Sequence, residues 1–416
     1  MQNTLNTMGE KARVAGRALA ISSTNHKNEA LAYMAQALRE SYEIIIHANN
    51  QDIALAKEKG LSEAMLDRLI LNTKRIDEMA EGLEALMALP DPIGESIAMW
   101  KRPNGMEIGQ IRVPLGVIGI IYEARPNVTV DAVGLTLKTG NAVILRGGSE
   151  AYHSNTALVE VLRTALAKTT IPMDAVQLIP FTDRQAANLL MRMNNYLDVL
   201  IPRGGAGLIK TVVENATVPV IQTGVGNCHV YIDKTADHSM GINIIINAKT
   251  QRPAVCNAME TLLVHRDEAE KFLPTLEKEM TLRGVQLRGC PESMNYLKHA
   301  VPATEKDWET EFLDLILAVK IVADMDEAVS HISRYGTKHS EAIITKDYAR
   351  ARRFMAEVDA AAVYVNASTR FTDGFQFGFG AEIGISTQKL HARGPMGLKE
   401  LTSTKYVIYG DGQVRE

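Results

Sequence analysis

The alternation of short apolar segments with longer amphipathic ones constrains the fold more than any other feature of this chain. From residue 117 onward, short β-rich runs are separated by segments with helical periodicity. Such alternation is typical of βαβ units, in which parallel strands form a sheet and helices cover both of its faces. We expect strands at residues 117–122, 142–145, 176–179, 199–201, 229–232, 261–265, 315–322, 342–345 and 361–366.

The first 90 residues carry the pattern of helices. Leu31, Met34, Ala35 and Leu38 recur at the spacing of one face of an amphipathic helix. Ser23 and Thr24 precede this run and are both suitable N-caps. We therefore expect a helical layer that packs on a sheet.

Charge and hydropathy exclude several classes of protein. The 416 residues carry a net charge of −4, which is not the basic surface of a nucleic-acid-binding protein. No apolar run approaches the roughly 20 residues that span a bilayer, and the first residues lack the apolar core of a secretory signal. We expect a cytoplasmic protein with neither a nucleic-acid nor a membrane partner, in which local cations bind any anionic substrate.

Three cysteines occur, Cys228, Cys256 and Cys290, and none forms a CxxC pair. This sparse, odd set argues against a disulfide framework and against a cysteine-rich zinc site, so we expect no metal. Cys228 and Cys290 are expected to act as small apolar residues. His229 adjoins Cys228, but neighbouring residues on a strand point to opposite faces, which argues against a catalytic dyad.

Cys256 lies in a different setting, the polar loop 251–258, which follows an expected helix and precedes the apolar run 261–264. Arg252 is close by in sequence, and we expect a helix to begin near the cysteine. Positive charge and the free N–H groups of a helix N-terminus both favour a thiolate. The loop therefore predicts a nucleophilic cysteine.

Two glycine-containing turns follow expected strands, although the chain has no P-loop and no complete GxGxxG sequence. Gly204-Gly205-Ala206-Gly207 precedes an expected helix, so its N–H groups could approach a phosphate closely. A tight turn that needs positive φ is the structural alternative. Arg146 ends another strand, where ligands of such sheets bind, and suits an adenosine ribose or its 2′-phosphate. An ordinary surface arginine is the alternative for Arg146, and it fits the sequence equally well.

The glycine-rich tail forms a long loop with many potential anion ligands. Such loops are often functional, although charge-rich loops without a site are more common. The charged residues are Arg370, Glu382, Lys389, His391, Arg393 and Lys399.

Four stretches carry a resemblance to a known family. They read YEARPN at 122–127, QRPAVCNA at 251–258, AVSHISRYGTKHSEAI at 328–343 and GAEIGISTQKLHARGP at 380–395. Over nearly its whole length the chain resembles the gamma-glutamyl phosphate reductase family of the aldehyde dehydrogenase superfamily. The resemblance implies an α/β fold with two Rossmann-type parallel-sheet domains and a small oligomerisation element.

The resemblance also implies domain bounds and partners. Residues 1–225, with about 357–380 returning to them, would bind NADP, and residues 226–356 would carry the nucleophile. Strands near 108–122 and 390–416 would form a homodimer or homotetramer. Functional coupling to glutamate 5-kinase is expected.

Site residues follow from the same resemblance. Cys256 corresponds to the thiol nucleophile and Asn127 to the side-chain amide that binds the oxyanion. Glu311 corresponds to the glutamate of the nicotinamide ribose. The cofactor-binding set comprises Arg146, Gly147, Ser149, Gly204, Gly205, Gly207 and Glu311. The first acidic residue after Arg146 is Glu150. No carboxylate therefore lies two or three positions after Arg146, where it would bind a ribose 2′-hydroxyl and repel a 2′-phosphate, and this favours NADP(H).

The chain departs from the superfamily at one position that distinguishes phosphate exchange of the thioester from its hydrolysis. Hydrolytic aldehyde dehydrogenases carry a glutamate base where this chain has Gln222. Because an amide cannot deprotonate water, a thioester here should be protected from hydrolysis. This favours the exchange of the thioester with phosphate over irreversible aldehyde oxidation.

The implied reaction is the NADPH-dependent reduction of L-glutamyl 5-phosphate to L-glutamate 5-semialdehyde, in proline biosynthesis. The substrate needs cationic subsites, for which Arg125, Arg252, Arg370 and Arg393 are candidates. Its ammonium group would meet Glu123, Asp373 or Glu382. The alternatives are a non-phosphorylating semialdehyde dehydrogenase, a cysteine hydrolase or amidotransferase, and a homologue without activity.

Overall fold

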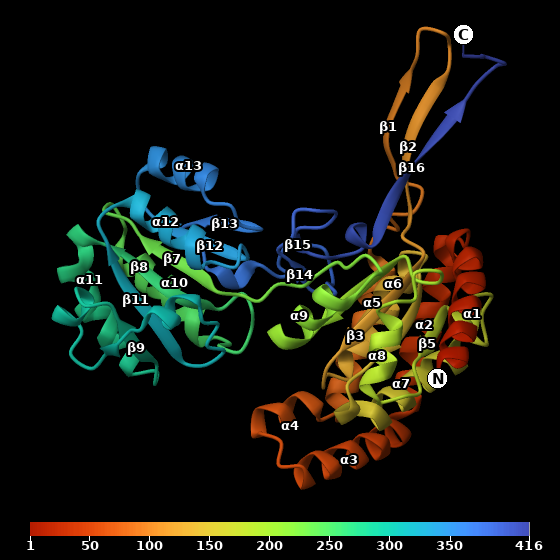
Figure 1. Ribbon diagram of the computed structural model, residues 1–416, viewed down its shortest axis with the longest axis horizontal. Helices are drawn as coiled ribbons and strands as arrows, with labels where there is room; N and C mark the ends of the chain where they lie inside the picture. Colours follow the sequence, from red (N-terminus) through yellow and green to blue (C-terminus); the bar gives the residue numbers. More distant parts are fainter. Residues whose placement is uncertain (416) are drawn as a thin grey trace. The chain divides into compact units, whose positions relative to one another are not determined.

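The computed structural model describes residues 1–415. For Ala64 it describes the backbone but not the side chain. The chain divides into two compact units (Figure 1). The first contains Met1–Thr223, Gly378–Gly384 and the chain from Met396 onward. The second contains Gly224–Phe377 and Ile385–Pro395.

A four-stranded parallel sheet of order β5-β4-β3-β6 forms the centre of the first unit. Its central strand β3 is buried along its whole length, as expected of a strand with helices on both faces. The strands are β3 (Val117–Tyr122), β4 (Ala142–Arg146), β5 (Val176–Leu178) and β6 (Val199–Arg203). Parallel strands end at one edge, so Tyr122, Arg146 and Arg203 lie at the edge where ligands bind in such sheets.

The expected helical N-terminal layer is present. Of the two expected N-caps, Ser23 accepts a hydrogen bond from the His26 N–H at 3.3 Å and caps α2. The layer comprises α1 (Gln2–Ala20), α2 (Thr24–Glu40), α3 (Tyr42–Glu58), α4 (Glu63–Leu69) and α5 (Thr73–Ala88). The helices between and after the strands are α6 (Asn127–Lys138), α7 (Tyr152–Leu166), α8 (Arg184–Leu190) and α9 (Ala206–Asn215).

A separate antiparallel sheet belongs to the same unit. It has the order β1-β2-β16, with β1 (Ser96–Lys101), β2 (Glu107–Pro114) and β16 (Thr402–Tyr409). The expectation of one oligomerisation element at 108–122 is therefore corrected, because β2 lies in this sheet and β3 in the parallel sheet. Of the stretch 390–416, only 402–409 joins the small sheet, and the structure does not describe residue 416.

The second unit contains a seven-stranded parallel sheet of order β10-β9-β11-β8-β7-β12-β13. Its strands are β7 (Cys228–Ile232), β8 (Met259–His265), β9 (Gln286–Gly289), β10 (Val301–Pro302), β11 (Ile316–Val322), β12 (Ser340–Ile344) and β13 (Ala362–Val365). The helices are α10 (His238–Thr250), α11 (Arg266–Thr281), α12 (Met325–Tyr335) and α13 (Tyr348–Glu357).

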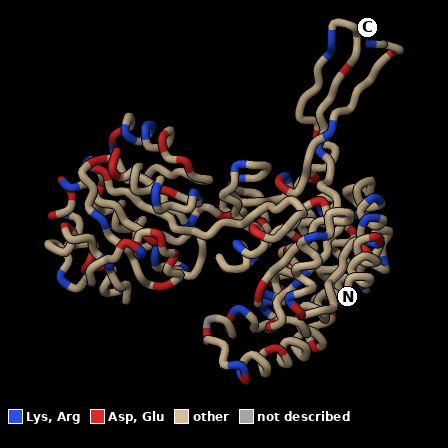
Figure 2. Tube along the Cα trace, in the orientation of Figure 1, with Lys and Arg blue, Asp and Glu red and all other residues tan. Residues whose placement is uncertain are grey.

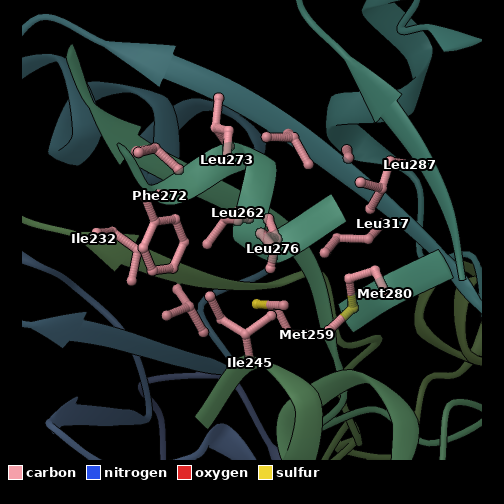
Figure 3. Packing of buried hydrophobic residues seen from close by; sticks show 14 of the residues in the cluster. Ile232, Ile245, Met259, Leu262, Phe272, Leu273, Leu276, Met280, Leu287 and Leu317 are labelled. Carbon is pink, nitrogen blue, oxygen red and sulfur yellow. The ribbon is translucent and has the colours of Figure 1, made fainter. Parts of the chain in front are cut away.

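Each face of this sheet has its own apolar core. Phe272 and Leu276 of α11 and Ile245 of α10 pack on Leu262 and Leu317 of the strands (Figure 3). On the opposite face, side chains of α12 and α13 pack on β7, β8 and β12. Helices thus cover both faces, as the alternation predicted.

The expected return of residues 357–380 to the first unit is corrected for 357–377, and of this stretch only residues 378–380 lie in the first unit. Strand β13 pairs with β12, which keeps the chain in the second unit as far as Phe377. The hairpin of β14 (Ile385–Ser386) and β15 (Gly394–Pro395) also belongs to the second unit. Short 3₁₀ helices lie at Ser149–Ala151, Met173–Ala175, Ser293–Asn295, Glu305–Glu309, Thr369–Phe371 and Lys399–Leu401.

Charges of both signs are interspersed along each unit (Figure 2). In the part of the chain that the structure describes, no helix is long and apolar enough to cross a membrane. Nor do three or more His, Cys, Asp or Glu residues of that part form a group that could hold a metal ion.

Candidate active site

Cys256 lies in a β-turn, not at the start of a helix. Helix α10 ends at Thr250 and β8 begins at Met259. The Ala258 N–H donates to the Val255 carbonyl at 3.0 Å and closes a turn with Cys256 as its second residue. The predicted contribution of a helix N-terminus to the thiolate is therefore corrected. Because a peptide's C=O and N–H point in opposite directions, the inward Val255 carbonyl turns the Cys256 N–H outward from the turn.

The next two carbonyls of the turn are also fixed. Cys228 Sγ donates to the Cys256 carbonyl at 3.2 Å, and Thr369 Oγ1 donates to the Asn257 carbonyl at 2.7 Å. The Asn257 side chain donates to the Thr372 carbonyl at 2.9 Å. Buried polar groups that are satisfied in this way hold a segment in one conformation.

Gly226 packs against the nucleophile's own backbone. A Cβ atom built on Gly226 would lie 1.5 Å from the Cys256 carbonyl oxygen, so no side chain fits there. The Gly226 N–H donates to Glu311 Oε1 at 2.9 Å. Burial raises the pKa of Glu311 above its ordinary value. Glu311 therefore supports the segment against Cys256 in this structure, and its role at a nicotinamide ribose stays a prediction.

Two arginines accompany the turn. Arg370, in the 3₁₀ helix Thr369–Phe371, donates from Nε to Gln251 Oε1 at 2.9 Å and from Nη1 to Asn257 Oδ1. It thus bonds to residues on both sides of Cys256. Burial lowers the pKa of Arg370, and the positive charge of the exposed Arg252 lowers it further. The loop therefore brings two cations close together beside the thiol.

Arg393 has a carboxylate partner instead. Its Nη2 atom lies 2.8 Å from Asp359 Oδ1, and Lys389 Nζ lies 2.8 Å from Asp359 Oδ2. Lys389 and Arg393 lower the pKa of Asp359 to about 2. In this arrangement Arg393 neutralises a carboxylate of its own unit.

A buried ion pair, which no local sequence pattern indicates, joins the two ends of the nucleophile loop. Lys249 Nζ lies 2.5 Å from Glu260 Oε2, and both side chains are fully buried. Burial lowers the pKa of Lys249 and raises that of Glu260 to about 7. Lys249 lies in the last turn of α10 and Glu260 at the start of β8, so the pair closes the base of the loop.

In the first unit, Arg146 ends β4 and has spare hydrogen-bonding capacity. Its Nη2 donates to the Thr182 carbonyl at 2.9 Å, while its buried Nε has no acceptor. Burial lowers the pKa of Arg146, and the charge of nearby Arg184 lowers it further. Arg184, which no sequence pattern indicates, adds a second cation to this strand end, while the carboxylates of Glu150 and Asp183 act on the pKa of Arg146 in the opposite direction.

The residues that follow Arg146 leave little room for side chains. A Cβ atom on Gly147 would lie 2.1 Å from Asn155 Nδ2, and one on Gly148 would lie 2.4 Å from Glu150 Oε2. Ser149 Oγ donates to Glu150 at 3.3 Å. Positions 147 and 148 therefore have no room for side chains, and Gly148 itself is buried. The unsatisfied Arg146 N–H group at this strand end is a donor that fits the adenosine ribose of a dinucleotide.

The turn 204–207 joins β6 to α9, as predicted, but it already contacts a carboxylate. The Gly205 N–H donates to Glu123 Oε2 at 2.9 Å, and a Cβ atom on Gly204 would lie 2.7 Å from the same carboxylate. The three glycines of the turn are not at positive φ, so that structural alternative does not apply. Gly207 has open space around it.

Asn127 and Arg125 lie after β3, at the same sheet edge. Asn127 is the exposed first residue of α6, and its Nδ2 donates to Asp131 Oδ2 at 3.3 Å. Burial raises the pKa of Asp131 to about 6. The Arg125 N–H donates to the Glu123 carbonyl at 2.7 Å. The second unit thus contains Cys256, Arg252, Arg370, Glu311, Asp373 and Arg393, and the first unit contains the other candidates.

Comparisons with known proteins identify relatives over the full chain. A model of the aldehyde dehydrogenase family matches residues 2–286. A gamma-glutamyl phosphate reductase of Moorella thermoacetica is 65% identical over 410 residues, which cover 99% of this chain and 98% of that protein. One of Carboxydothermus hydrogenoformans is 65% identical over 415 residues and covers 100% of both chains.

Two solved structures also match this chain over nearly its whole length. The crystal structure of a gamma-glutamyl phosphate reductase from Thermotoga maritima matches with a TM-score of 0.97 and 52% identity, covering 99% of this chain and 100% of that one. An acetylating aldehyde dehydrogenase from Geobacillus thermoglucosidasius matches with a TM-score of 0.71 and 18% identity, covering 100% and 98%. The second likeness concerns the fold alone.

Proposed function

Because this chain belongs to the gamma-glutamyl phosphate reductases of the aldehyde dehydrogenase family, we propose that it reduces L-glutamyl 5-phosphate with NADPH through an acyl thioester on Cys256. The products are L-glutamate 5-semialdehyde and phosphate, in the cytoplasm, as a step toward proline. The observation that carries the mechanism is the hydrogen-bonded turn of Cys256 with Arg252 and Arg370 beside it. Supply of the acyl phosphate by glutamate 5-kinase is part of the proposal.

The first step is attack of the Cys256 thiolate on the acyl carbonyl. The turn directs the Cys256 N–H outward, where it can donate to the oxyanion that develops, and the Asn127 amide is proposed as the second donor from the resemblance. Phosphate then leaves, and the charges of Arg252 and Arg370 stabilise the departing anion. The acyl group stays on sulfur as a thioester.

When bound, NADPH would supply the hydride that reduces the thioester carbon. Arg146, Gly147, Ser149 and the turn 204–207 are proposed to hold NADP(H), with Glu311 at the nicotinamide ribose. The same oxyanion donors stabilise the tetrahedral product of reduction. Its collapse releases the aldehyde and returns the thiolate of Cys256.

Gln222 distinguishes this reaction from non-phosphorylating aldehyde oxidation, which is the second candidate. A side-chain amide has no lone pair basic enough to deprotonate water. The thioester therefore persists long enough for phosphate to attack it in the reverse direction. Oxidation of the semialdehyde should depend on phosphate.

The test is NADP reduction by the purified protein with L-glutamate 5-semialdehyde, with and without phosphate, alongside Cys256→Ser. We expect activity that requires phosphate and is absent in the variant. Equal activity without phosphate would identify an ordinary aldehyde dehydrogenase. A fully active Cys256→Ser enzyme would contradict the thioester.

Preference for NADP over NAD is supported by the two cations at the end of β4, Arg146 and Arg184, which suit a 2′-phosphate. The carboxylates of Glu150 and Asp183 also act on Arg146 and would repel a 2′-phosphate. We expect NADPH to give a higher kcat/KM than NADH, and an Arg146→Gln variant to narrow the difference. Comparable rates with both cofactors in the unmodified enzyme would refute this preference.

Assembly into a homodimer or homotetramer is supported by the small sheet. Both of its edge strands expose large apolar side chains, and such edges are normally covered by another chain. The exposed residues are Ile97, Met99, Trp100, Tyr406, Ile408 and Tyr409.

A further inference from the structure

Cys228 takes no part in the proposed reaction, yet its side chain contacts the backbone of the nucleophile. Its sulfur is fully buried at the start of β7 and donates to the Cys256 carbonyl at 3.2 Å. Gly226, two positions earlier, presses its backbone against the same carbonyl. The segment that leads into β7 thus encloses this carbonyl from two sides.

The carbonyl in question belongs to the middle peptide of the 255–258 turn. Turns of types I and II differ by a rotation of this peptide through roughly 180°, and type II needs positive φ at the third residue. The third residue is Asn257, a type that tolerates positive φ, but its φ is not positive in the structure. Two orientations are therefore accessible to this sequence, and the Cys228 thiol bonds to one of them.

The thiol also belongs to a chain of buried polar groups that returns to the turn. Cys228 Sγ lies 3.7 Å from His339 Nδ1, which lies 2.8 Å from Ser340 Oγ. Ser340 Oγ lies 2.6 Å from Thr372 Oγ1, and the Thr372 carbonyl accepts from Asn257. Burial and the Glu341 carboxylate raise the pKa of Cys228 well above its ordinary value, so the sulfur keeps its proton and remains a donor.

We propose that Cys228 is a positioning residue whose S–H group selects one orientation of the middle peptide and so keeps the Cys256 sulfur and N–H in the geometry of attack. This inference rests on the proposed function, which gives the turn its catalytic task. Without the donor, the buried carbonyl loses a partner and the peptide gains a second orientation. Because rotation changes ψ of Cys256 and φ of Asn257, the Asn257 side chain would leave its bonds to Arg370 and to the Thr372 carbonyl. The turn would then lose the anchors that hold Cys256 in place.

Three variants separate this role from simple packing. Cys228→Ala removes the donor, and Cys228→Ser keeps a donor of shorter reach. Cys290→Ala is the matched control, because Cys290 is a second buried cysteine of the same unit. Its sulfur accepts hydrogen bonds from Ser293 and Ile321, at 3.5 and 3.4 Å, and has no contact with the turn.

Two readouts are measured for each variant, together with the thermal midpoint. For Cys228→Ala we expect kcat to fall by about tenfold or more, with KM for the semialdehyde within about twofold, because misplacement of a nucleophile acts on the chemical step. Alkylation of Cys256 by iodoacetamide at pH 7, followed by peptide mass spectrometry, should slow by about fivefold or more as the sulfur leaves its place beside the cations. Cys228→Ser should recover most of both rates, and Cys290→Ala should match the unmodified protein.

A Cys228→Ala enzyme with unchanged kcat and alkylation rate would overturn the proposal, as would an equal loss in Cys290→Ala. If Cys228→Ala does not fold, the proposal is tested with a folded Cys228→Ser enzyme. A loss of more than about tenfold in the kcat of that enzyme refutes the proposal. The alkylation measurement needs no substrate. Absence of phosphate-dependent activity in the unmodified protein would therefore refute the proposed function, while the alkylation rates would still test the role of Cys228.

Discussion

Arg252 and Arg370 differ in how much of their hydrogen-bonding capacity the protein itself uses. Arg370 donates to Gln251 and Asn257 and thereby helps to build the nucleophile loop. Arg252 is exposed and donates to no residue that the structure describes. An incoming phosphate would therefore find its free donors mainly on Arg252, whereas Arg370 contributes charge and order.

Replacement of Arg252 by Gln should weaken phosphate binding without disturbing the fold. A hydrogen bond to a charged group contributes about 1.5–3 kcal/mol, so KM for phosphate in the oxidative direction should rise roughly tenfold to a hundredfold. Arg266→Gln, at an arginine of the same unit that is 61% exposed, is the control and should leave KM unchanged. An unaltered KM for phosphate in Arg252→Gln would exclude Arg252 from the anion site.

The half-buried Asp131 predicts a pH dependence of stability. Its folded pKa of about 6 lies above the ordinary 3.8, so the folded state holds more protons than the unfolded state between these values. Stability from this group therefore falls as the pH rises through that window. Asp131→Asn should raise the thermal midpoint at pH 8, and the gain should vanish by about pH 4. A gain that is the same at both pH values would show that the ionisation is not responsible.

At the scale of elements, the sequence predicts those helices and strands that are long enough to show a periodic pattern. The long β-branched runs and the amphipathic helices are periodic, so strands such as β8 and β11 lie where the alternation places them. Strands β9 and β10 were missed because four and two residues are too few to show a period.

The nucleophile loop shows the limit of local pattern most clearly. Cys256 was correctly placed in a loop, but the expected helix start is a β-turn. The partners that hold the turn lie 28 residues before Cys256, at Cys228, and 112 residues after Asn257, at Thr369. Such contacts depend on the sheet that brings the elements together. The polar loop and the family resemblance both indicated the cysteine, but neither indicated the distant residues that support it.

The Lys249–Glu260 pair predicts a large stability effect at the base of this loop. Removal of one partner from a buried pair leaves an uncompensated charge and costs about 3–5 kcal/mol. Glu260→Gln should therefore lower the free energy of unfolding by about that amount, measured by denaturant titration. The double variant Lys249→Met with Glu260→Gln should recover most of the loss, because no buried charge remains.

A surface pair provides the comparison. Lys210 and Glu214 lie 3.8 Å apart on α9 with side chains 75% and 60% exposed. Glu214→Gln should change the free energy of unfolding by less than about 0.5 kcal/mol. An equally small effect of Glu260→Gln would mean that the buried pair does not hold the ends of the loop.

At the scale of the whole molecule, the candidate groups divide between the two units. The first carries the strand ends and glycine turns proposed for NADP(H), and the second carries Cys256 with its two arginines. The small sheet of β1, β2 and β16 belongs to the first unit, yet every residue of β1 is exposed. A short antiparallel sheet is marginally stable when neither face is covered. A second copy of the chain is therefore the most economical explanation of its exposed apolar residues.

Placing a charge on β16 should dissociate the proposed oligomer. Ile408 is 60% exposed on this edge strand, and Ile408→Asp would put a carboxylate into the apolar contact. Val14→Asp is the matched control, because Val14 is also 60% exposed but lies on α1. Light scattering coupled to size exclusion should give a smaller mass for Ile408→Asp and an unchanged mass for Val14→Asp. Because a carboxylate at an apolar interface loses its hydration, the effect should persist at high salt, which screens charge repulsion but does not restore hydration. An unmodified protein that is monomeric at micromolar concentration, or an Ile408→Asp variant of unchanged mass, would mean that the small sheet does not join subunits.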